Sequence, residues 1–177
     1  MASGHPGQIA TLILPGDTAW QDAGDARMPA PEPAMRKVPD AARVEAIAKV
    51  LRSGEPVLLI LANTATRGRA LELAGKVAAG TGCRLGSQFF TARMERGAGR
   101  VPLERIPYAV AQGAAFLAGF RHLVTIETKE PVAFFSYPDK PSLLKAPGTL
   151  VHGLVEPGED SVVGLEMLVD ALGLGAT

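Results

Sequence analysis

The feature that most constrains the fold is an uninterrupted apolar run at residues 56–62. It reads Pro-Val-Leu-Leu-Ile-Leu-Ala, with no polar residue at any position. A strand with one face toward water alternates apolar and polar side chains, whereas a strand of a parallel sheet covered by helices is apolar on both faces. The run therefore predicts a central strand of a parallel sheet, and with it an α/β fold.

Helical patterns surround this strand. Val44, Ile47 and Leu51 recur at helical spacing after Asp40, a residue type that caps helices, and Gly54 ends the pattern. Similar signals predict helices at residues 67–79, 107–118 and 160–172, and short strands at residues 83–86, 123–126, 132–135 and 149–154. The alternation predicts a doubly wound, mostly parallel sheet, in which ligands bind beyond the carboxyl ends of the strands.

The first forty residues have a different character. Residues 9–14 form a short β-rich run that predicts a strand, although no upstream segment could pair with it. Residues 24–39 contain four prolines between alanines, which is the composition of a linker. We therefore expect a tail at residues 1–23, a Pro/Ala-rich linker at residues 24–39, a central α/β domain at residues 40–155 and a further segment at residues 156–177.

Composition excludes several classes of protein. The 177 residues carry 18 lysines and arginines against 18 aspartates and glutamates, so the chain lacks the single-sign field of a nucleic-acid binder. Cys83 is the one cysteine, which rules out an internal disulfide or a zinc cage and fits a reducing cytoplasm; we expect a small buried hydrophobe there. No apolar run approaches the roughly 20 residues of a membrane span, so no membrane segment is expected.

The common motifs of catalytic chemistry are missing. Residues 97–99 begin like a dinucleotide fingerprint but follow no predicted strand and do not complete it, and residues 75–76 lack the rest of a phosphate-binding loop. The histidines His5, His122 and His152 have no metal-ligand spacing, and no nucleophile stands in a triad pattern. We interpret His122 as a strand-edge residue whose ring bonds to backbone.

Two loops could still bind a ligand. Asn63 and Thr64 follow the central strand, where they either cap the next helix or present donors to a nucleotide; capping is the favoured interpretation. Arg93, Arg96 and Arg100 lie among glycines, where they could hold an anionic ligand or a partner's carboxylates. The alternative for these arginines, a solvated loop, is favoured.

Six segments, in order, carry a family resemblance. They are residues 58–61, 67–71, 92–102, 105–108, 117–123 and 131–138, the last reading Pro-Val-Ala-Phe-Phe-Ser-Tyr-Pro. Together they resemble the central domain of thiamine-diphosphate-dependent enzymes of the acetolactate synthase-like group, which includes benzoylformate decarboxylase-like proteins. Residues 10–20 resemble the closing strand of that family's pyrimidine-binding domain, and residues 157–172 resemble the lead into its pyrophosphate-binding domain.

The resemblance implies a Rossmann-like central domain with a six-stranded parallel sheet. It also implies that thiamine diphosphate and Mg²⁺ are held by the other two domains, through an activating glutamate on one and a Gly-Asp-Gly motif followed by asparagine on the other. This chain has neither: the sequences at residues 16–18, 24–26 and 158–160 all lack the closing glycine. We therefore expect no catalytic residue and no metal site here, and we expect the two missing domains and further copies of the chain as partners.

The same resemblance bears on flavin. Acetolactate synthases keep FAD in this domain, whereas related decarboxylases do not. Residues 62–64 read Ala-Asn-Thr where a glycine-rich loop would admit a nucleotide's phosphates, and their side chains hinder a close approach. Tightly bound FAD is therefore not favoured. Were it bound, the residues lining the strand-end crevice would be Asn63, Thr64, Arg93, Thr128 and Lys129.

The leading hypothesis is a scaffold and oligomerisation domain of a 2-oxoacid enzyme. The whole enzyme would be a transferase or lyase that decarboxylates a 2-oxoacid and joins the product to a second molecule, and this chain alone would be inactive. The alternatives are a stand-alone nucleotide- or flavin-binding α/β module, a benzoylformate decarboxylase-like lyase, and a structural domain that has lost its ligand. Fold resemblance alone does not separate them.

Overall fold

The computed structural model describes residues 4, 7–25, 27, 29–30, 32 and 34–175. The chain divides after Arg36 into two parts, which are described separately. None of the helices within the described ranges is both long and apolar enough to cross a membrane.

In the part up to Arg36, the described residues form one regular element, the short helix α1 (Gly16–Trp20). The strand predicted at residues 9–14 is wrong: this segment has no regular structure, and Ile9 and Leu12 are 98% and 85% exposed. A strand is held by hydrogen bonds to a neighbouring strand, and no described segment pairs with this one. Positions 26, 28, 31 and 33 of the predicted linker lie outside the described residues.

The part from Lys37 onward contains a five-stranded sheet in which every pair is parallel. Its order is β3 (Glu104–Arg105), β2 (Arg84–Ser87), β1 (Val57–Leu61), β4 (His122–Ile126) and β5 (Leu150–Val155). All five residues of β1 are buried, as the apolar run predicts. The predicted fold class, a doubly wound parallel α/β sheet, is confirmed.

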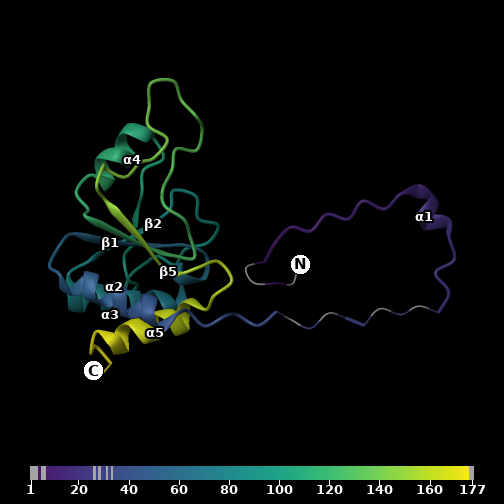
Figure 1. Ribbon diagram of the computed structural model, residues 1–177, viewed down its shortest axis with the longest axis horizontal. Helices are drawn as coiled ribbons and strands as arrows, with labels where there is room; N and C mark the ends of the chain where they lie inside the picture. The colour runs from purple at the N-terminus through teal and green to yellow at the C-terminus, as the bar shows by residue number, and fades with distance from the viewer. Residues whose placement is uncertain are drawn as a thin grey trace. The chain divides into compact units, whose positions relative to one another are not determined.

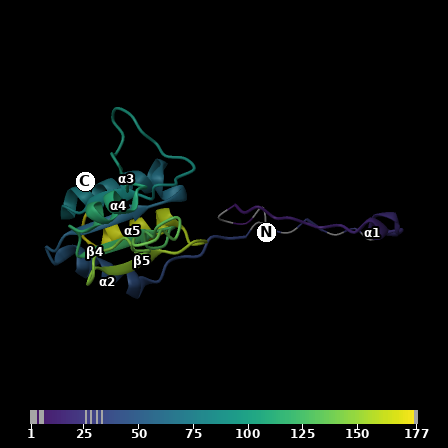
Figure 2. The same cartoon turned by 90° about the horizontal axis from the view of Figure 1, so that it is seen from above.

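Helices cover both faces of this sheet (Figure 1). On one face lie α2 (Ala41–Arg52), α3 (Gly68–Thr81) and α5 (Ser161–Ala171); on the other lies α4 (Val110–Leu117). The cap predicted for α2 is confirmed, because a carboxylate oxygen of Asp40 accepts the Ala42 N–H at 2.7 Å. Figure 2 shows the sheet from another direction, with β5 lying beside β4 at the edge.

The described strands number five rather than six. Residues 132–135 form no strand: Val132 makes only an isolated bridge to Leu143, and Phe134 and Phe135 are more than half exposed rather than buried in the sheet. The strand β3 was not predicted from sequence. It has two residues, both exposed, and so carries no apolar pattern that could be detected.

We expect Leu59→Ala to destabilise the domain by about 2 to 5 kcal/mol, because it empties space inside the core next to β2 and β4. Leu59 is fully buried in β1. The matched control is Leu12→Ala, which removes the same atoms from a side chain that is 85% exposed. Urea unfolding measures both variants. Equal losses of stability would contradict the assignment of β1 as the central strand.

Candidate functional site at the carboxyl edge of the sheet

The order of the strands places a crevice between the carboxyl ends of β1 and β4. The chain proceeds from β1 outward to β2 on one side, and from β4 outward to β5 on the other. Doubly wound sheets bind ligands where the strand order reverses in this way, outside the carboxyl ends of the two diverging strands. The candidate site is therefore formed by the segments that follow β1 and β4.

Glu127, the first residue after β4, lies in this crevice and is 3% exposed. Its carboxylate accepts hydrogen bonds from the Thr64 N–H at 3.2 Å, from the Thr64 hydroxyl and from the Ser161 hydroxyl. Its carbonyl oxygen accepts the side-chain amide of Asn63 at 3.1 Å. One side chain thus joins the end of β1, the end of β4 and the start of α5.

Glu127 is not among the site residues selected from sequence. A carboxylate is buried when partners satisfy it, and those partners lie 63 and 34 residues away in the sequence. The available signal was the position itself, directly after a fully buried strand.

Asn63 and Thr64 are held by Glu127 instead of capping the next helix. The N-cap of α3 is Arg67, which makes no side-chain cap bond, so the favoured interpretation of these two residues as caps is wrong. They form the start of a 3₁₀ turn, η1 (Asn63–Thr66), in which Asn63 has a left-handed φ of 47°. Their donors face the crevice, as the nucleotide hypothesis requires, but Glu127 already accepts from them.

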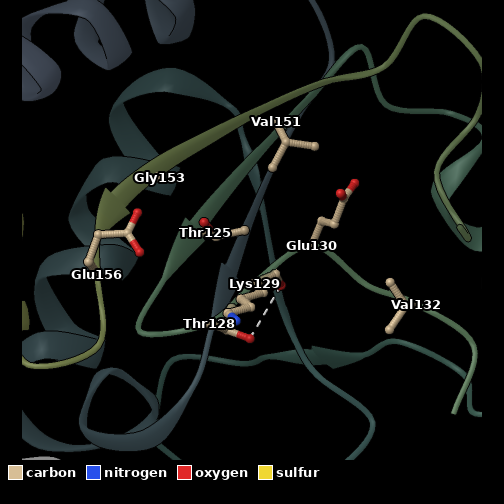
Figure 3. Close-up of a pocket in the computed structure, with 8 residues that line it drawn as sticks. All are labelled: Thr125, Thr128, Lys129, Glu130, Val132, Val151, Gly153 and Glu156. Atoms are coloured by element: carbon tan, nitrogen blue, oxygen red, sulfur yellow. Dashed lines mark hydrogen bonds between the residues drawn. The ribbon is translucent and has the colours of Figure 1, made fainter.

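Thr128 and Lys129 line a separate cavity of about 450 Å³ beside the crevice. Figure 3 shows it between the loop after β4 and the strand β5. The residues that line it are Thr125, Thr128, Lys129, Glu130, Val132, Val151, Gly153 and Glu156. Gln88 fixes the loop, because its side-chain amide donates to the Thr128 hydroxyl at 3.2 Å and to the Lys129 carbonyl at 3.0 Å.

Arg93 belongs neither to the hydrogen bonds at Glu127 nor to the lining of this cavity. Its side chain is exposed, and its carbonyl oxygen accepts the Thr66 hydroxyl at 2.7 Å. Arg100 pairs with Glu95 at 3.2 Å. The five residues selected from sequence thus separate into a pair at Glu127, a pair on the cavity and an exposed arginine. A ligand role for them stays a prediction.

A second titratable cluster lies at the opposite edge of the sheet, where β4 begins. The buried His122 ring bonds to the Glu55 carboxylate through Nε2 at 2.7 Å and to Nε2 of His152 through Nδ1 at 3.0 Å. Its partners are side chains, so the backbone partners expected from sequence are wrong. The hydrogen bond from His122 lowers the pKa of Glu55, and burial, with the neighbouring His122, lowers the pKa of His152.

Neither cluster fits a metal ion. Across the part of the chain that the structure describes, no three histidine, cysteine, aspartate or glutamate side chains converge in a way that could hold one. Cys83 is buried, and burial raises the pKa of its thiol, as expected of a small hydrophobe rather than a nucleophile. The described residues therefore offer no set of ligands that fits the magnesium ion which the family resemblance assigns to other domains.

The chain was compared with protein-family models and with curated proteins. No protein-family model matches the chain. Among curated proteins it is 43% identical over 157 residues to the "Putative acetolactate synthase large subunit IlvX" of Mycobacterium tuberculosis, in a match that covers 89% of this chain and 30% of that protein. The chain resembles part of an acetolactate synthase-like protein. The resemblance stated from sequence is confirmed, over 30% of the relative's length.

Solved structures share the fold of this chain. One is a "putative thiamin diphosphate-dependent enzyme isolated from Mycobacterium smegmatis", with a TM-score of 0.61 over 85% of this chain and 31% of that chain. Another is the benzoylformate decarboxylase from Polynucleobacter necessarius, with a TM-score of 0.58 over 92% of this chain and 30% of that chain. Both are 17% identical in sequence, so they establish the fold alone.

We expect the free energy of unfolding to fall as the pH drops below 6.5, the ordinary pKa of a histidine. The folded state lowers the pKa of His152, so the unfolded chain binds the added proton more readily. The stability that the neutral ring provides is present above pH 6.5 and is lost as the pH falls through the lowered pKa of the folded state.

The matched variant is His152→Gln, which keeps a side-chain N–H donor and does not titrate. Its free energy of unfolding should change less than that of the wild type between about pH 7.5 and about pH 5.5, a range in which histidine is the main titrating side chain. Urea unfolding at each pH gives both curves. Parallel curves for the two proteins would contradict the role of His152.

Proposed function

We propose that this chain is the central scaffold and oligomerisation domain of a thiamine-diphosphate-dependent 2-oxoacid enzyme of the acetolactate synthase-like type. The observation that carries the proposal is the extent of the match. Nearly all of the chain, 89%, aligns at 43% identity, yet the alignment accounts for 30% of the relative. A segment of that extent is the size of one domain within a larger enzyme.

The site geometry supports a scaffold role over a catalytic one. At the carboxyl edge, the polar groups of Asn63 and Thr64 bond to Glu127, and at the opposite edge His122 bonds to Glu55 and His152. Neither cluster joins a nucleophile to a general base over a cavity, which covalent catalysis requires. In this proposal, thiamine diphosphate and Mg²⁺ belong to the other domains, and FAD is not favoured.

An exposed aromatic cluster supports the proposed partners. Six aromatic side chains contact one another ring to ring: Phe89, Phe90, Tyr108, Phe134, Phe135 and Tyr137. Phe90, Phe134 and Phe135 are each more than half exposed. Contiguous exposed apolar surface of this kind is typical of contact sites. We propose that the missing domains, or further copies of the chain, pack against it.

The whole enzyme, in this proposal, decarboxylates a 2-oxoacid and joins the remaining fragment to a second carbonyl compound. We expect the purified 177-residue chain to release no carbon dioxide from pyruvate in the presence of thiamine diphosphate and Mg²⁺, because it lacks the residues that hold them. A polypeptide roughly three times longer, detected in the source cells with an antibody to this chain, should have the activity.

Carbon dioxide release by the purified chain would refute the scaffold assignment. Detection of the native polypeptide only at the size of this chain would instead favour a stand-alone module. An intact acetolactate synthase-like enzyme, assayed in parallel, shows that the assay detects turnover.

A further inference from the structure

We propose that Glu127 is an internal anion: its carboxylate occupies the position at the β1–β4 crevice where folds of this type hold a ligand's phosphate, and so excludes anionic nucleotides. This inference concerns the chain's own crevice and does not depend on the proposed function. It goes beyond the expectation from sequence, which attributed poor nucleotide binding to the side chains of residues 62–64.

The first argument is the identity of the donors. Doubly wound folds bind phosphate with backbone N–H groups and hydroxyls at the start of a segment that follows a strand. Here those donors are the N–H and hydroxyl of Thr64, just after β1, and the hydroxyl of Ser161, the first residue of α5. All three donate to the Glu127 carboxylate. An entering phosphate would find the donors occupied.

The second argument is that displacing Glu127 disrupts more than one contact. Besides its carboxylate bonds, its N–H donates to the Val155 carbonyl at 2.8 Å, and its own carbonyl accepts from Asn63. Glu127 has a left-handed φ of 55°, a conformation that favours glycine, and Asn63, to which it bonds, has one of 47°. Two strained residues that hold one another in place indicate a selected arrangement rather than an accidental contact.

The third argument is electrostatic. The neighbouring cavity of about 450 Å³ is large enough for a small ligand, but Glu130 and Glu156 line it together with one cation, Lys129. Lys145 offsets Glu130 at 3.3 Å, and Arg43 lies 4.0 Å from Glu156. A phosphate group moving from this cavity toward Thr64 would approach a third carboxylate, that of Glu127, which is buried and therefore poorly screened.

The experiment measures binding of ADP, FAD and inorganic phosphate to the 177-residue chain by isothermal titration calorimetry. The variants are Glu127→Gly, which frees the three donors and suits a left-handed φ, and Glu127→Gln, which keeps the shape and removes the charge. Glu130→Gln is the matched control: it removes a carboxylate from the same loop but leaves the bonds to Thr64 and Ser161 intact. Circular dichroism verifies that each variant folds.

The wild type and Glu130→Gln should show no saturable binding of any probe up to about 1 mM, and Glu127→Gly should bind ADP or FAD at least about tenfold more tightly. Glu127→Gln, which retains an accepting oxygen, should lie between them. If Glu127→Gly does not fold, Glu127→Gln decides the question. Saturable binding by the wild type, equal binding by Glu130→Gln and Glu127→Gln, or no gain in any folded Glu127 variant would each overturn the proposal.

Discussion

Burial of β1 on both faces is the constraint on which the rest of the domain depends. Leu59 and Leu61 pack into the core beneath α2, α3 and α5, while Leu58 and Ile60 pack into the core on the α4 side. A strand in this position needs neighbours on both edges, and β2 and β4 both pair with it in parallel. Parallel pairing requires crossovers outside the sheet, so all strand ends of one kind lie along the same edge.

That common edge explains why residues far apart in the sequence meet there. The segments after β1 and β4 and the start of α5 converge there, and they bring together the half-buried Thr64 and the buried Glu127 and Ser161. Such groups must be paired, because an unpaired buried donor or carboxylate is costly. Glu127 satisfies donors from two of these segments at once. At the crevice between β1 and β4, the chain's own hydrogen bonds thus satisfy the polar groups that these segments bring together.

Side-chain hydrogen bonds also cross the opposite edge of the sheet. Glu55, before β1, bonds to His122 at the start of β4, which bonds to His152 on β5. Both ends of the sheet are thus fixed by side-chain networks, and a separate cluster of exposed aromatic side chains lies on the loops around Phe90 and Phe134. The aromatic cluster is the surface on which the proposed contacts with other domains depend.

Local patterns in the sequence were sufficient for α2 and its Asp40 cap, for β1, and for the parallel α/β class, because helix periodicity, capping and a two-sided apolar strand are properties of neighbouring residues. They failed at residues 9–14 and 132–135, where β-rich composition is present but most of the apolar side chains are exposed and no strand forms, and at β3, which is too short to show a pattern. The domain boundaries and the ligand role of the five selected residues stay predictions.

Only the tertiary structure identified Glu127 and the His122–His152 pair. Whether a carboxylate or an imidazole is buried and hydrogen-bonded depends on partners from distant segments, and the spacing of residues in the sequence does not specify those partners.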